Sequence, residues 1–180
     1  MVWKLGAGPR QTPTLVGRLD HGPYGWLGKH ARLEDNMAET IGRLGGTGLP
    51  DADLRSLAAF LRKGLARPER SDRVGAKDPV AARGRALFTS EGVGCSGCHK
   101  LETEASDRGL HSVGSRGASD TTDGFRTPPL LFVGATGPYF HDGRYATLEQ
   151  LLTDNLDRMG QTTQLSPDDL KAIAAFLRTL

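Results

Sequence analysis

The chain has 180 residues, which corresponds to one domain or two small ones. Its formal net charge of +2 is too small to indicate a nucleic-acid partner or an anionic membrane surface. No apolar run approaches the roughly 18 residues of a membrane span, and the first ten residues lack the apolar core of a signal peptide. Aromatic residues make up only 6% of the chain, so its core must come from small aliphatic side chains or from a bound group.

Apolar spacing predicts five helices, and no segment alternates as a β-strand does, so we expect an all-α fold. Residues 1–20 and the polar segment 103–127 are expected to be loops, and the charged segment 67–78 a linker. Asp78-Pro79 and Ser166-Pro167 are typical helix starts. The expected helices are residues 32–44, a helix starting at residue 50, one starting at 78, residues 147–158 and a last one starting at 166.

The helix that begins at Asp78 and the last helix of the chain are expected to cross. Gly84 would allow close approach of the two backbones, and Phe88 would pack near Phe176. The crossing predicts contact between residues 79–89 and residues 168–179.

An internal repeat links the two ends of the chain. When residue 12 is aligned with residue 127, and one gap is allowed, residues 12–62 contain 21 identities with residues 127–178. The order and spacing of the matches favour two copies of one module over chance similarity of turns and helices. Residues 79–124 have no counterpart in the first copy, which we therefore expect to be a partial module.

The pentapeptide Cys95-Ser96-Gly97-Cys98-His99 is the strongest chemical signal in the chain. Two thiols at this spacing can form thioethers with the two vinyl groups of one haem, and the adjacent imidazole then ligates the iron. One covalent haem c would also supply the apolar core that the few aromatic residues cannot.

Two other uses of these cysteines compete with haem attachment. A redox-active Cys-x-x-Cys pair normally follows a strand in a βαβ unit, and no such unit is predicted. A structural zinc site could combine Cys95 and Cys98 with two of His99, His111 and His141. No second Cys-x-x-Cys or His-x₃₋₅-His pair supports zinc.

The sixth iron ligand has three candidates downstream of the haem motif: His111, His141 and Met159. Met159 is predicted at the end of a helix, and a thioether is a soft ligand that favours ferrous iron. In the first copy of the repeat, Leu44 takes the place of Met159, and Trp26 takes that of His141. We expect Leu44 and Trp26 to fill space rather than bind metal. The first copy is therefore expected to be a haem-less scaffold.

Several segments carry a family resemblance. They are residues 84–88 (GRALF), 125–130 (FRTPPL), 137–149 (GPYFHDGRYATLE) and 165–180. These segments resemble the C-terminal cytochrome domain of di-haem cytochrome c peroxidases and the related methylamine-utilisation (MauG-type) proteins. The resemblance covers residues 79–180 closely and residues 10–65 more loosely.

The resemblance implies a class I cytochrome c-like domain over residues 79–180, preceded by a partial module over residues 1–66. It also implies His99 and Met159 as axial ligands of a high-potential haem, with Tyr145 as the alternative that some MauG-type members use. The peroxidatic haem of the family belongs to a preceding domain, and residues 1–78 contain no second Cys-x-x-Cys-His. We therefore expect this chain to be part of a longer protein.

The expected function is single-electron transfer through one haem c, with a redox partner protein and a missing N-terminal haem domain as partners. The alternatives are a truncated di-haem peroxidase-like oxidoreductase and a zinc-binding structural domain. Covalent haem attachment implies the periplasm.

Overall fold

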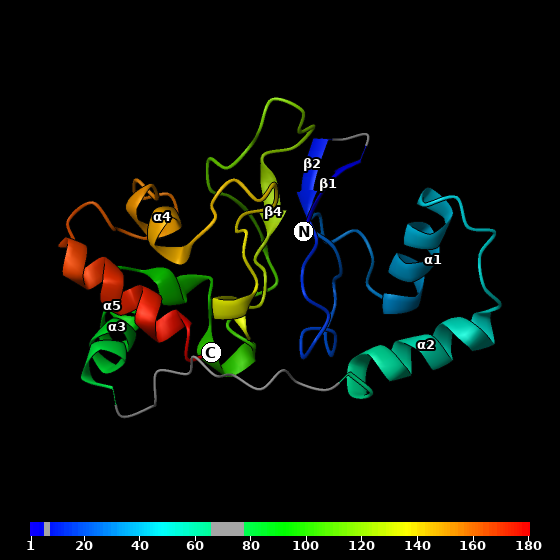
Figure 1. The fold of residues 1–180 in the computed structure, drawn as a ribbon, viewed down its shortest axis with the longest axis horizontal. Helices are drawn as coiled ribbons and strands as arrows, with labels where there is room; N and C mark the ends of the chain where they lie inside the picture. The colour runs from blue at the N-terminus through cyan, green and yellow to red at the C-terminus, as the bar shows by residue number, and fades with distance from the viewer. Residues whose placement is uncertain (6–7, 66–77) are drawn as a thin grey trace. The chain divides into compact units, whose positions relative to one another are not determined.

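The computed structural model describes residues 1–5, 8–65 and 78–180 (Figure 1). The chain forms two compact units, Thr14–Glu69 and a larger one that joins Met1–Pro13 to Arg70–Leu180. The larger unit thus includes the first thirteen residues, which the sequence had assigned to the first module. The predicted linker, apart from Asp78, lies outside the described residues.

The unit Thr14–Glu69 is built on two helices, α1 (Leu33–Arg43) and α2 (Asp51–Lys63). The Tyr24 hydroxyl donates to the Leu19 carbonyl oxygen at 2.9 Å, and the Nε of Arg62 in α2 donates to the same oxygen at 3.1 Å, which holds the preceding loop to α2. One apolar face of each helix points inward, as the sequence spacing predicts. The buried core consists of Leu19, Tyr24, Leu33, Met37, Leu54 and Ala58.

The larger unit contains α3 (Pro79–Thr89), α4 (Leu148–Thr153) and α5 (Pro167–Leu177). The predicted caps are confirmed: the Asp78 carboxylate accepts from the Val80 N–H, and Ser166 forms a reciprocal capping box with Asp169. Among the described residues, no helix is long and apolar enough to cross a membrane.

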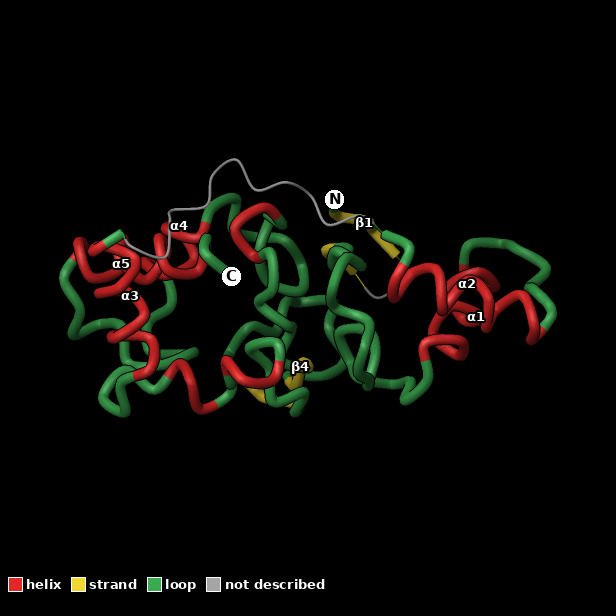
Figure 2. The backbone as a smooth tube through the Cα atoms, turned by 90° about the horizontal axis from the view of Figure 1, so that it is seen from below, coloured by secondary structure: helices red, strands yellow, loops and turns green. Residues whose placement is uncertain are grey.

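Helices α3 and α5 lie side by side in both views (Figures 1 and 2). A Cβ atom on Gly84 would lie 1.9 Å from the Ala172 carbonyl oxygen, so only glycine permits this approach. The rings of Phe88 and Phe176 lie 5.3 Å apart between centroids. The predicted crossing is therefore confirmed.

The expectation that no strand would form was wrong. Strand β1 (Val2–Leu5) pairs antiparallel with β2 (Gly8–Gln11), and β3 (Leu110–Ser112) pairs antiparallel with β4 (Gly124–Arg126). Each strand has three or four residues, too few for an alternating pattern to stand out in the sequence. The described residues also form the 3₁₀ turns η1 (Cys95–Gly97), η2 (Leu101–Thr103) and η3 (Val133–Ala135).

The segment 103–127 is more than the surface loop that its polarity predicted. Ser106, Ser115 and Asp120 are buried, with relative exposures of 1%, 1% and 4%. The Ser106 hydroxyl donates to the Thr127 carbonyl oxygen at 2.7 Å, and Asp120 Oδ2 accepts from the Gly117 N–H at 2.7 Å. Polar composition misleads here because buried polar groups are stable when they are hydrogen-bonded.

Both copies of the predicted repeat make the same local contacts. Tyr24 bridges to His30 in the first copy, and Tyr139 bridges to Tyr145 in the second. In each copy, an arginine at the end of the last helix pairs with the glutamate that follows the leucine at the start of α1 or α4: Arg62 with Glu34, and Arg178 with Glu149. These shared contacts support the repeat. The absence of haem from the first copy stays a prediction.

One detail of the first copy differs from its prediction. Leu44 follows α1 and is 66% exposed, so it does not fill space in a core. Its backbone N–H ends the helix by donating to the carbonyl oxygens of Gly42 and Thr40, and three of the next four residues are Gly45, Gly46 and Gly48. A chain that leaves the helix at a glycine-rich turn carries Leu44 into solvent. Trp26 is partly buried.

Candidate haem site

The haem motif forms a tight turn after Gly94, which adopts a left-handed backbone with a φ of +77°. The turn is closed by the His99 N–H, which donates to the Cys95 carbonyl oxygen at 3.1 Å. Both Cys95 and Cys98 are free thiols. Burial raises the pKa of the Cys95 thiol to about 11, so this thiol is protonated at neutral pH.

The imidazole of His99 is oriented by one backbone carbonyl. Its Nδ1 donates to the Ala105 carbonyl oxygen at 3.0 Å, which leaves the lone pair of Nε2 available for a metal. The Asp107 N–H donates to the Cys98 carbonyl oxygen at 2.7 Å and holds the Ala105 segment against the motif. Burial lowers the pKa of His99 below its usual value, so the neutral form that ligates iron is favoured.

Met159 lies in a loop, whereas the sequence predicted it at the end of a helix. Helix α4 ends at Thr153, and Leu156 and Asp157 have positive φ angles of 48° and 61° that no helix continues through. The buried side chain of Asn155 replaces the helical bonds of this segment. Its Oδ1 accepts from the Met159 N–H at 3.0 Å, and its Nδ2 donates to Gly160 O at 3.0 Å.

The Met159 loop lies directly against the segment that precedes Cys95. The Gln161 N–H donates to the Val93 carbonyl oxygen at 2.8 Å, and the Cys95 Sγ lies 3.8 Å from the Met159 carbonyl oxygen. A Cβ atom on Gly160 would lie 2.5 Å from Val93 O and 3.1 Å from Cys95 Sγ. The attachment thiols, the oriented imidazole of His99 and the backbone of Met159 thus lie in one region. Imidazole and thioether are ligand types that haem iron takes in cytochromes c.

His141 has a different environment from the one expected of a ligand. It is 2% exposed, its Nε2 donates to Asp120 Oδ2 at 2.9 Å, and its ring stacks on Phe125 at 3.7 Å between centroids. Asp120 also pairs with Arg10 at 2.6 Å, and the Gln11 N–H donates to the His141 carbonyl oxygen at 2.7 Å. His141 and Asp120 therefore tie strand β2 to the rest of the larger unit.

The pKa values of this buried pair follow from its surroundings. Burial lowers the pKa of His141 because it disfavours the charged ring by more than the neighbouring carboxylates favour it. The pKa of Asp120 is also below its usual value: burial raises it, but hydrogen bonds from Gly117, His141 and Arg10 outweigh that effect.

The hydroxyl of Tyr145, the family's alternative ligand, donates to Asp154 Oδ2 at 2.6 Å. His111, the remaining histidine candidate, has its Nε2 2.7 Å from Asp107 Oδ2.

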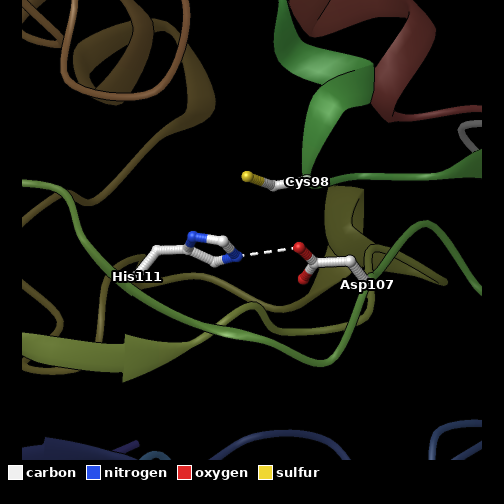
Figure 3. Close-up of side chains that lie close together, drawn as sticks. All are labelled: Cys98, Asp107 and His111. Atoms are coloured by element: carbon white, nitrogen blue, oxygen red, sulfur yellow. Dashed lines mark hydrogen bonds and ion pairs between the residues drawn. The ribbon is translucent and has the colours of Figure 1, made fainter.

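Cys98, Asp107 and His111 come close together, as Figure 3 shows. Their ligand atoms lie within 4.8 Å of one another, and within the described ranges they form the one group that could hold a bare metal ion. This group leaves out Cys95, His99 and His141, so it does not support the zinc set that the sequence offers as an alternative to haem. Attachment of haem would also remove its thiolate, because Cys98 would become a thioether.

The profile of the cytochrome c family matches residues 81–180. The chain belongs to the cytochrome c family. It is 30% identical to the methylamine utilisation protein MauG of Methylorubrum extorquens over 123 residues, which is 56% of this chain and 34% of MauG. It is 41% identical to cytochrome c551 peroxidase of Nitrosomonas europaea over 56 residues, which is 31% of this chain and 16% of that protein. The matched regions thus span about a third or less of these relatives.

Solved structures share the fold. Hydrazine synthase of Kuenenia stuttgartiensis, studied under xenon pressure, matches with a TM-score of 0.86 at 21% identity, over 100% of this chain and 76% of that one. A MauG-like protein associated with microbial copper homeostasis matches with a TM-score of 0.74 at 19% identity, over 99% and 76%. The predicted relation to MauG-type proteins and cytochrome c peroxidases is confirmed. Family membership implies covalently bound haem c and haem-based electron transfer.

Sequence reasoning missed the residues that position the candidate ligands His99 and Met159. Asp107 could have been noticed because Asp107-Arg108-Gly109 is typical of an Asx turn, and its Oδ1 indeed accepts from the Gly109 N–H. Asn155 had no comparable signal, because its partners in the Met159 loop are set by side-chain geometry.

Proposed function

We propose that the chain carries one haem c on the thiols of Cys95 and Cys98, with His99 and Met159 as axial ligands, and transfers single electrons. The observation that carries the proposal is the pairing of the Met159 loop with the Cys95 segment through Gln161 N and Val93 O. It supports a methionine ligand because it holds the loop beside the attachment cysteines.

The protein's own residues position the two proposed axial ligands. Iron in a bound haem c alternates between ferrous and ferric states, which is the chemistry that the group supplies. His99 keeps its Nε2 free through the bond to Ala105, and Asn155 fixes the backbone of Met159. Phe88 and Phe176 are 3% and 4% exposed and help to keep water out of the region beside His99.

The proposal extends to partners and location. A single-electron carrier needs a protein that donates or accepts electrons, and a haem-bearing domain of the kind that precedes this module in di-haem peroxidases is a second partner. Covalent haem attachment, together with MauG and the cytochrome c peroxidase as relatives, favours the periplasm.

The first copy of the repeat, residues 12–62, is proposed to be a scaffold without haem. Residues 1–78 contain no Cys-x-x-Cys-His motif. A pyridine haemochrome spectrum combined with an iron-to-protein ratio tests the whole assignment. We expect one iron per chain and a c-type spectrum; zinc without haem would reject electron transfer, and two irons would reject the haem-less scaffold.

A peroxidase-like oxidoreductase is the second candidate, because the chain is related to MauG and to a cytochrome c peroxidase. Reduction of peroxide needs an iron with an open or labile position, and Met159 would occupy that position. We therefore expect slow peroxide consumption, or none, by the haem-loaded chain with excess reduced donor. Sustained turnover of about 10 per second would instead make the chain a peroxidase.

A further inference from the structure

Residues 104–108, which lie between η2 and strand β3, have an unusual backbone. Glu104, Ala105 and Arg108 have φ angles of 64°, 55° and 59°, in the left-handed region that non-glycine residues seldom adopt. Such a backbone persists only where surrounding contacts hold it, and it is often found beside functional groups. Here the segment carries the Ala105 carbonyl oxygen, which accepts from His99 Nδ1 at 3.0 Å.

The residue that can direct this carbonyl is Ser106. Ala105 has only a methyl side chain, whereas Ser106 shares the peptide plane of the carbonyl and is 1% exposed. The Ser106 hydroxyl donates to the Thr127 carbonyl oxygen at 2.7 Å and accepts from the Arg108 N–H at 3.0 Å. The Ser106 carbonyl oxygen accepts from the Thr103 hydroxyl at 2.7 Å. These hydrogen bonds anchor the residue that completes the peptide plane of the Ala105 carbonyl.

Asp107, the next residue, contributes to the same segment in a different way. Its backbone N–H donates to the Cys98 carbonyl oxygen at 2.7 Å and does not depend on the side chain. Its carboxylate accepts from the Gly109 N–H at 2.9 Å and lies 2.7 Å from His111 Nε2. The Asp107 side chain therefore orders the approach to β3 rather than the carbonyl beside His99.

We propose that Ser106 is a positioning residue for the haem ligand His99, because it holds the Ala105 carbonyl at hydrogen-bonding distance from Nδ1. The inference rests on the proposed function, in which His99 ligates the iron. A hydrogen bond from the far nitrogen raises the basicity of a ligating imidazole. A more basic imidazole stabilises ferric iron, and hydrogen bonds around the ligands are one way in which a protein sets the reduction potential of haem. Ser106 therefore lowers the reduction potential of the electron carrier, and it does so through the backbone.

The test compares Ser106→Ala with Ser115→Ala in the full haem-loaded chain. Ser115 is the matched control, because it lies in the same polar segment and is also 1% exposed. The Nδ1–H signal of His99 is followed by NMR in the reduced, diamagnetic state. We expect Ser106→Ala to move this signal upfield and to speed its exchange with solvent about fivefold, because the hydrogen bond to the Ala105 carbonyl is weakened. The reduction potential should rise in Ser106→Ala and keep the parent value in Ser115→Ala.

A milder variant covers the case in which Ser106→Ala fails to fold around haem. Thr103→Val keeps the size of a half-buried side chain and removes its hydroxyl, and with it the hydrogen bond to the Ser106 carbonyl oxygen. We expect the Nδ1–H signal of His99 and the reduction potential to change in the same direction as in Ser106→Ala, by a smaller amount.

Two results overturn the proposal. One is a parent-like Nδ1–H signal and potential in whichever of Ser106→Ala and Thr103→Val folds, even if urea unfolding shows a loss of stability, because Ser106 would then serve the fold alone. The other is an equal change in Ser115→Ala. The haemochrome spectrum and the iron ratio of the parent chain test the proposed function separately. A chain without haem rejects that function, whereas unchanged readouts in haem-loaded variants reject only the role of Ser106.

Discussion

Replacing Gly84 with alanine perturbs the contact on which the haem module is built. An added Cβ would lie 1.9 Å from the Ala172 carbonyl oxygen and 2.9 Å from the Ile173 nitrogen. Both atoms belong to the backbone of α5, so no side-chain rotation relieves the clash, and α3 and α5 must move apart. Inserting a group into a close-packed contact costs about 1–3 kcal/mol, and separation also weakens the Phe88–Phe176 ring pair, which is worth about 0.5–1.5 kcal/mol.

Helix propensity opposes this loss, because alanine is favoured over glycine inside a helix by about 1 kcal/mol. We therefore expect Gly84→Ala to lower the free energy of unfolding by about 2 kcal/mol. Gly42→Ala in α1 is the matched control, because a Cβ there meets nothing within 4 Å. The control should raise stability by about 0.5–1 kcal/mol.

Both variants are measured by urea unfolding of the haem-loaded chain, followed by circular dichroism for all helices and by haem absorbance for the larger unit. A stability gain in Gly84→Ala similar to that in Gly42→Ala would refute the reasoning. That result would mean that the close approach of α3 to α5 contributes nothing to stability.

The remaining predictions concern the ligand loop and the buried histidine. Met159→Ala should leave haem attached through Cys95 and Cys98, abolish the near-infrared band of methionine–ferric ligation, and lower the reduction potential, because a thioether stabilises ferrous iron. Asn155→Ala leaves the Met159 N–H and the Gly160 carbonyl without their partner; it should cost about 1–3 kcal/mol of stability and weaken the same band. The pKa of His141 is lowered in the fold, so the unfolded chain binds more protons below about pH 6.5, and stability should fall as the pH drops below that value. Urea unfolding at pH 7.5 and 5.5 measures this loss, which His141→Gln should reduce.

Each of these predictions has an outcome that contradicts it. An unchanged spectrum and potential in Met159→Ala would transfer the ligand role to His141 or Tyr145. An Asn155→Ala variant with wild-type stability would show that the loop is held by other contacts. If His141→Gln lost as much stability on acidification as the parent chain, other groups would account for the pH dependence.

The sequence by itself determined the features that depend on neighbouring residues. The haem motif is contiguous, because two thiols must reach the two vinyl groups of one ring and the imidazole must follow directly. The helix starts at Asp78 and Ser166 are equally local, since a cap bonds only to backbone groups within three residues. The close approach at Gly84 was also predictable, because the apolar spacing of both helices pointed to one contact.

Only the tertiary structure decided the features that join distant segments. The early end of α4 depends on Asn155, whose side chain bonds to residues of the Met159 loop instead of continuing the helix. The pairing of strand β2 with His141, and the burial of His141 against Asp120, connect residues more than twenty positions apart. The sequence around a polar residue does not identify the distant group with which it will form a hydrogen bond. Whether it is solvated or buried is decided by which distant groups the fold brings within hydrogen-bonding distance.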